Sequence, residues 1–142
     1  MPLLAVQVDD QANKHDAPSG GTGRVLLVDD EDVVRQATGE LLASLGWQVV
    51  PARDGEEGVR HFAENPDGFT LAVLDSSMPR MDGLACFRSM RKLRPGLPVV
   101  FCSGYTRDHT RTELPGEAHV AFVQKPFRIA ELVQAIQSVR QS

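Results

Sequence analysis

The chain has 142 residues, a formal net charge of −4 and 42% hydrophobic residues, values that fit one globular domain with a buried core. The mild acidity disfavours a nucleic-acid-binding protein, which usually carries a clustered basic face. No apolar stretch approaches the ~18 residues of a membrane span, and the first residues lack the basic lead of a secretory signal. The two cysteines, Cys86 and Cys102, show no C-x-x-C spacing. We therefore expect a cytoplasmic protein with no nucleic-acid partner and no direct membrane contact.

The first 23 residues differ in composition from the rest of the chain. Residues 9–23 (DDQANKHDAPSGGTG) have little apolar content and end in Ser, Gly and Thr. Such a segment cannot contribute to a core and is typical of a flexible linker or tail. We expect a linker or N-terminal tail over 1–23 and a folded domain over 24–142.

From Arg24 onward, short apolar runs alternate with segments of helical periodicity. The first run, 25–28, precedes a predicted helix over 31–45, whose apolar positions are Val33, Val34, Ala37, Leu41, Leu42 and Leu45. The later runs lie at 47–52, 71–74, 98–103 and 119–124, and the later helices are predicted at 54–64, 83–94 and 127–140. Segment 105–119 is mostly polar and contains Pro115, so we expect a short or loosely held helix there.

The apolar runs are unbroken, which favours strands covered on both faces, as in a parallel sheet. Five such strands alternating with helices predict an α/β fold, an open sheet built from right-handed crossovers. In such a sheet, ligands bind at the carboxyl ends of the strands.

Functional side chains cluster at those predicted strand ends. Asp29 and Asp30 follow the first strand, Asp75 follows the third, Ser103 ends the fourth and Lys125 follows the fifth. Two carboxylates about 4 Å apart repel each other by roughly 4 kcal/mol at an effective dielectric near 20. The sequence therefore predicts that a counter-charge lies among the acids.

Each of these residues also has a structural interpretation. Asp30, with the acids that follow it, could cap the helix over 31–45 and complement its dipole. Asp75 and Ser103 could be turn residues, and Lys125 could be an ordinary surface lysine. Asp82-Gly83 is interpreted only as a helix cap. The joint occurrence of the acids, the hydroxyl and the lysine at strand ends favours a functional site.

A divalent cation would supply the counter-charge, since Mg²⁺ prefers oxygen ligands. A carboxylate beside such an ion can act as a nucleophile toward phosphorus and form an aspartyl phosphate. Phosphoryl transfer requires in-line positioning and neutralised oxygens, to which Lys125 would contribute charge and Ser103 a hydrogen bond.

The stretches "VLLVDDE", "LDSSMPRMDG", "SGY" and "QKPF", in this order, resemble the receiver domain of two-component response regulators. The resemblance covers 24–140. It implies a flavodoxin-like doubly wound sheet of order 2-1-3-4-5 with helices on both faces. It also implies that Asp75 is the phosphoacceptor and that Asp29, Asp30, Asp75 and the backbone carbonyl of Ser77 hold Mg²⁺.

The resemblance further implies a conformational switch and a set of partners. Ser103 occupies the position of the switch hydroxyl and Phe122 that of an aromatic ring that moves inward. Phosphate on Asp75 would draw Ser103 inward and let Phe122 rotate. The implied partner is a histidine kinase or a histidine phosphotransfer domain, and a homodimer is compatible with the family. The domain is not expected to be an enzyme beyond its own phosphorylation and dephosphorylation.

The sequence leaves the parent protein open between a single-domain regulator and the C-terminal receiver of a hybrid sensor histidine kinase. The start "PLLAVQV" followed by the polar stretch is similar to a kinase domain running into a tether, so we expect the hybrid. Two other classes remain as alternatives. One is a receiver-like interaction module that is never phosphorylated. The other is an aspartate-dependent phosphatase, which would need a second acid where Ser77 stands.

Overall fold

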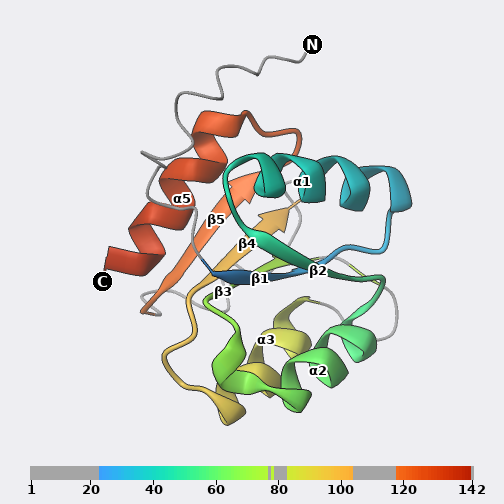
Figure 1. Cartoon of the computed structure of the whole chain (residues 1–142), viewed down its shortest axis with the longest axis vertical. Coiled ribbons are helices and arrows are strands. Elements are labelled where there is room, and N and C mark those ends of the chain that lie inside the picture. The colour runs from blue at the N-terminus through green and yellow to red at the C-terminus, as the bar shows by residue number, and fades with distance from the viewer. Residues whose placement is uncertain (1–22, 77, 79–82, 104–117, 142) are drawn as a thin grey trace.

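The computed structural model describes residues 23–76, 78, 83–103 and 118–141. It contains a five-stranded parallel sheet of order β2-β1-β3-β4-β5 (Figure 1). The predicted sheet order is therefore confirmed. The strands are β1 (Arg24–Val28), β2 (Gln48–Ala52), β3 (Leu71–Asp75), β4 (Val99–Ser103) and β5 (Val120–Gln124).

Helices cover both faces of this sheet. They are α1 (Asp32–Ser44), α2 (Gly55–Glu64), α3 (Gly83–Leu93) and α5 (Ile129–Gln141), with a short 3₁₀ turn η2 (Pro66–Gly68) before β3. Helices α1 and α5 lie on one face and α2 and α3 on the other (Figure 1). No helix in these described ranges is long and apolar enough to cross a membrane.

The alternation of side chains along the strands builds two cores. In β1, Val25 and Leu27 pack toward α1 and α5, whereas Leu26 and Val28 pack toward α2 and α3. Such alternation is the ordinary geometry of a strand, and it explains why the run is apolar throughout. The central strand β3 is buried at all five positions, so its last residue, Asp75, is only 5% exposed.

The predicted element boundaries agree with the structure to within one or two residues. Helix α2 begins where Asp54 accepts a hydrogen bond from the backbone N–H of Glu57 at 2.8 Å, an N-cap of the usual kind. The predicted weak helix over 105–119 falls almost wholly outside the described residues, as does the predicted linker except for Gly23.

The apolar positions of α1 are only partly buried. Only Thr38 and Leu42 are buried in this helix, and Val33 is 80% exposed. The first turns of α1 lie beyond the carboxyl end of β1, where the sheet no longer provides a surface to pack against. The apolar side chains of this part of α1 instead line a groove that is described below.

Candidate functional site

The carboxyl end of β1 places two acids in different environments. Asp29 is 3% exposed, and its backbone N–H donates to the carbonyl of Ala52 at 3.2 Å, which continues the β1–β2 ladder. Its Oδ1 accepts the backbone N–H of Glu31 at 2.9 Å. Asp30, the next residue, is exposed. Glu31, not Asp30, is the N-cap of α1 and makes no side-chain capping bond, whereas Asp32 is an acid in the first turn that complements the helix dipole.

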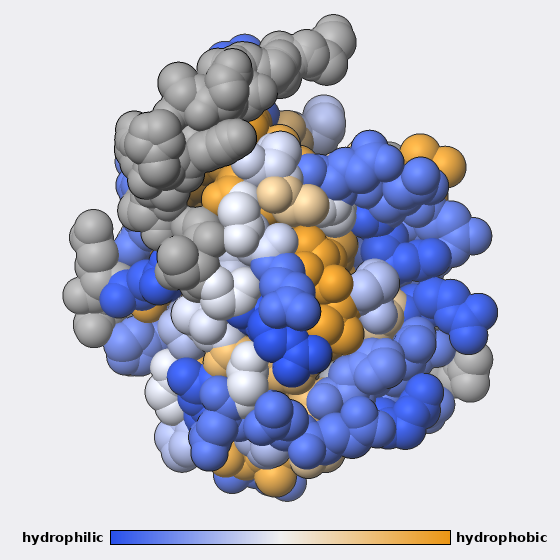
Figure 2. Space-filling model, viewed as in Figure 1, coloured by the Kyte–Doolittle hydropathy of each residue, from blue (hydrophilic) through white to orange (hydrophobic). Residues whose placement is uncertain are grey.

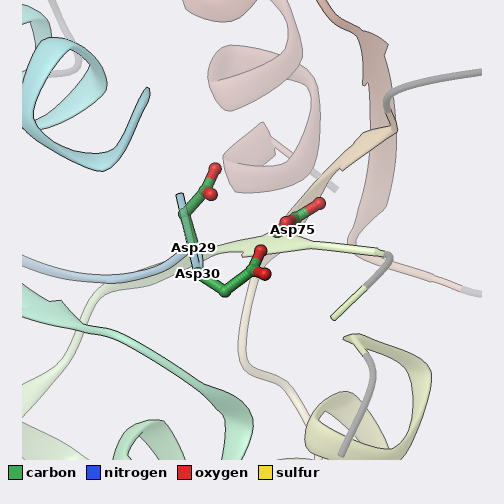
Figure 3. A group of neighbouring side chains, drawn as sticks. All are labelled: Asp29, Asp30 and Asp75. Carbon is green, nitrogen blue, oxygen red and sulfur yellow. The ribbon is translucent and has the colours of Figure 1, made fainter. Parts of the chain in front are cut away.

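The neighbouring strand β3 supplies the third acid. Asp75 is the last residue of β3 and pairs in register with Cys102 of β4. Asp29, Asp30 and Asp75 each present a carboxylate oxygen within 4.8 Å of the others (Figure 3). The structure thus brings together the three acids that the sequence placed at strand ends.

Lys125, which directly follows β5, lies against this acid cluster. Its Nζ is 3.0 Å from Asp29 Oδ2, 3.5 Å from Asp75 Oδ1 and 3.9 Å from Glu31 Oε1, and its side chain is 15% exposed. Burial alone would lower the pKa of Lys125, but the hydrogen bond to Asp29 and the charges of Asp75 and Asp29 outweigh it, so the pKa is raised. Lys125 is therefore a permanent cation at neutral pH.

The backbone around Lys125 fixes its position. Its N–H donates to the carbonyl of Ser103 at 2.7 Å, which links the ends of β4 and β5, and the following peptide bond to Pro126 is cis. Ser103 is half-buried and lies one residue past the partner of Asp75, at the same edge of the sheet.

Phe122 lies within β5, opposite Phe101 of β4. The two rings are stacked, with centroids 5.5 Å apart, and Phe122 is half-buried against the α2–α3 core. Ser77 lies outside the described residues, so no geometry is assigned to it.

The charges at the site leave room for a divalent cation. Three aspartates face a single buried ammonium group, and Cys102 contributes no further anion, since burial raises the pKa of its thiol to about 12. Three carboxylates with at least one exposed member match the oxygen-rich, partly hydrated coordination that Mg²⁺ requires. Asp29, Asp30 and Asp75 therefore fit such an ion.

Two residues that contact the backbone of this site were missed in the sequence analysis. Gly83, interpreted only as part of a cap, opens α3 directly behind Asp75. A Cβ atom there would lie 2.4 Å from the Asp75 carbonyl oxygen and 2.7 Å from Ser76 Cα, so only glycine lets α3 approach this closely. The Asp-Gly pair at the start of a helix was the available signal. The second residue is Arg35, which carried no signal in the sequence.

Comparisons with known proteins agree with this geometry. The family model described as "Response regulator receiver domain" matches residues 25–137, and the chain belongs to this family. The chain is 35% identical over 119 residues to the sensor kinase CckA of Brucella abortus (strain 2308). The match covers 84% of this chain but only 13% of that kinase.

Solved structures give the same result. The receiver domain from the hybrid histidine kinase CckA is 34% identical with a TM-score of 0.71, and the match covers 84% of this chain and all of that one. The response regulator TrrA from Thermotoga maritima, in complex with Mg²⁺-BeF, is 29% identical with a TM-score of 0.73, covering 83% and 99% of the two chains.

Proposed function

We propose that this domain accepts a phosphoryl group from a phosphohistidine onto Asp75, with Mg²⁺ as cofactor. The observation that carries the proposal is the approach of three aspartates to within 4.8 Å, with the Lys125 ammonium on two of them. Asp29, Asp30 and Asp75 would hold the cation, together with the backbone carbonyl of Ser77.

The chemistry follows from the position of each group. A carboxylate oxygen of Asp75 attacks phosphorus in line, the P–N bond to the donor imidazole breaks, and the imidazole leaves as the neutral base after protonation. A cation held by Asp29, Asp30 and Asp75 would supply charge to neutralise phosphoryl oxygens, and Lys125 provides the second positive charge beside Asp75. The product is an acyl phosphate, which adds about −1.5 to −2 charge and three acceptor oxygens at the end of β3.

The Ser103 hydroxyl and the Phe122 ring are the proposed readout of that charge. Ser103 ends β4 beside the strand that carries Asp75, which supports the proposal that its hydroxyl donates to a phosphoryl oxygen. Movement of Ser103 would free space along β4 and β5, where Phe122 stacks on Phe101. The proposed response is an inward rotation of Phe122 from its half-buried position.

A groove leads to the phosphoacceptor and provides the approach for the donor. Its volume is about 710 Å³, and Asp75 and Lys125 are among the residues that line it. One wall is the apolar side of α1, with Val33, Val34, Ala37 and Leu41, and the other is formed by Pro126 and Phe127. An amphipathic helix of a histidine kinase or a histidine phosphotransfer domain, with its histidine directed at Asp75, is the proposed occupant.

The remaining proposals concern the parent protein. Because the matched region is a small part of sensor kinase CckA, we propose that this chain is the receiver of a hybrid histidine kinase and acts in the cytoplasm. The domain itself would promote only its own phosphorylation and dephosphorylation. The phosphatase alternative lacks the second acid that it needs, since Ser77 occupies that position.

Incubation with acetyl phosphate and Mg²⁺ tests the proposal. Intact-mass spectrometry should show the gain of one phosphoryl group, lost in Asp75→Asn and on removal of Mg²⁺ by EDTA. Asp67→Asn, which removes an exposed acid from η2, should be phosphorylated like the wild type. In the same sample, a beryllofluoride mimic should shift the NMR signals of the Ser103 amide and the Phe122 ring. Absence of the mass gain would favour the unphosphorylated interaction module.

A further inference from the structure

Arg35, in the first turns of α1, is bonded to the loop that carries the acid pair. Its Nη1 donates to the backbone carbonyl of Asp29 at 3.0 Å, and its Nη2 donates to Asp32 Oδ1 at 2.7 Å. The Arg35 side chain is 16% exposed, whereas that of Asp32 is 83% exposed. One planar guanidinium group therefore spans the turn from the end of β1 to the start of α1.

These bonds fix a turn that otherwise has few restraints. Glu31, the N-cap of α1, makes no side-chain capping bond, so the start of the helix lacks the usual stabilisation. The Asp29 carboxylate is held by Lys125 and by the N–H of Glu31. Asp30 is different, because none of the described residues donates a hydrogen bond to its carboxylate. The direction of the Asp30 side chain is therefore set by the backbone of this turn.

Arg35 is positively charged, so it cannot act as a ligand of the cation. A guanidinium group near a cation site repels the cation, so electrostatics alone would favour a neutral residue at this position. The presence of Arg35 near this site is explained if its hydrogen bonds stabilise the turn by more than its charge weakens cation binding.

We propose that Arg35 is a positioning residue for the divalent-cation site and acts through the backbone of Asp29 and Asp30. The inference rests on the proposed Mg²⁺ site. Arg35 holds the Asp29 carbonyl and so orients the next residue, Asp30, toward Asp29 and Asp75. Its loss leaves all three carboxylates in place but lets the Asp30 carboxylate sample directions away from the cation.

Mg²⁺ titrations of the purified chain, followed by the backbone amide signals of Asp29 and Asp30, test this inference. Arg35→Met should weaken Mg²⁺ binding about tenfold, the size of effect that residues orienting metal ligands usually have. Arg35→Lys keeps the charge but loses the two-pronged contact, so it should also bind Mg²⁺ more weakly than the wild type. Arg60→Met, which removes an exposed cation from α2, should stay within about twofold, because exposed charges far from a site are screened.

The sign of the change decides the outcome. If Arg35 acts only through its charge, Arg35→Met will bind Mg²⁺ more tightly than the wild type and Arg35→Lys will match it, which would overturn the inference. Equal affinity in all three proteins would overturn it as well. Failure of the proposed function is distinct, since the wild type would then bind no Mg²⁺ at this site. Should Arg35→Met fail to fold, Arg35→Lys decides alone.

Discussion

At the scale of single residues, Lys125 is the group that lets two buried carboxylates coexist. Asp29 and Asp75 are 3% and 5% exposed, and the Lys125 ammonium is within 3.5 Å of an oxygen of each. Removing one partner of such a buried set is costly, because the remaining charges stay desolvated without compensation. This arrangement also explains why burial does not neutralise Lys125.

Lys125→Met should therefore lower the free energy of unfolding by about 2 kcal/mol at pH 7 in EDTA. This loss is smaller than the loss from breaking a fully buried ion pair, because one side of the site is open to solvent. The folded pKa of Lys125 is raised, so its stabilisation is complete below the ordinary lysine pKa of 10.5 and is lost as pH rises through the folded value. Urea unfolding of both proteins should show a constant difference from pH 7 to 10 that shrinks at higher pH. The exposed Lys92→Met should change stability by less than about 0.5 kcal/mol. A difference that persists unchanged at high pH would contradict the assignment.

At the scale of elements, the exposed edge strand β2 is protected against pairing with another chain. The N–H of Gln48 and the carbonyl of Ala52 bond to the β1 side, so the alternate positions Val49, Pro51 and Arg53 direct their backbone groups outward. Pro51 has no N–H, and the N–H of Arg53 donates to Glu57 at 2.7 Å. Two of these three outward positions thus offer no free donor to an incoming strand.

An apolar edge strand with free backbone donors would tend to pair with another chain, and the surface near β2 is partly apolar. Figure 2 shows hydrophobic side chains gathered near the middle of the face, over the region where Figure 1 places β2, with hydrophilic surface on both sides. Pro51→Val would add a backbone donor and a β-branched side chain to this edge. We expect self-association that increases with concentration in analytical ultracentrifugation. Pro66→Val, the same change in η2, should stay in the wild-type state, and a monomeric Pro51→Val would show that the edge is blocked by other means.

The elements differ in how far the sequence could predict them. Unbroken apolar runs of strand length predicted all five strands. Strands β1, β3 and β4 are buried almost throughout, as such runs indicate, whereas the edge strands β2 and β5 are partly exposed. For α1, helical periodicity identified the apolar positions but not what covers them, and Val33 among them is 80% exposed.

The candidate site shows the same division. Asp29, Asp30, Asp75 and Lys125 were predictable because parallel strands end at one edge of the sheet. Arg35 and Gly83 were not, since their roles depend on a hydrogen bond to a carbonyl and on a close backbone approach. The hydrogen bond of Arg35 leaves no pattern in the residue types of a single sequence, and the Asp-Gly pair at Gly83 indicates the start of a helix but not the close approach to Asp75.

At the scale of the whole molecule, the two helical layers have different surroundings. Helix α1 leaves Val33 80% exposed, in the lining of the groove that also contains Asp75. On the opposite layer, Leu93 of α3 is 49% exposed and lies outside that groove. The molecule therefore presents apolar surface beside its site on one layer and away from it on the other.

Val33→Glu should slow phosphoryl transfer from a phosphohistidine protein at least tenfold, because it places a charge in an apolar contact surface. A tenfold effect corresponds to a loss of about 1.4 kcal/mol of binding free energy between the two proteins. Phosphorylation by acetyl phosphate should be unchanged, since that small donor does not use the groove. Leu93→Glu should leave both reactions unchanged. The two rates can be compared by phosphate-affinity electrophoresis, and an equal loss with both donors in Val33→Glu would place Val33 in the chemistry instead of in docking.

The contact between Lys125 and Asp29 joins positions 96 residues apart in the chain. An unfolded chain pays a large entropic cost to bring these two positions together, whereas the folded sheet holds them in place through β1, β3, β4 and β5. A ligand that binds at this site prefers the native state, so the free energy of its binding adds to the stability of the whole sheet. Binding of a ligand to the carboxylate oxygens at this edge of the sheet is therefore thermodynamically coupled to the folding of the strands that carry them.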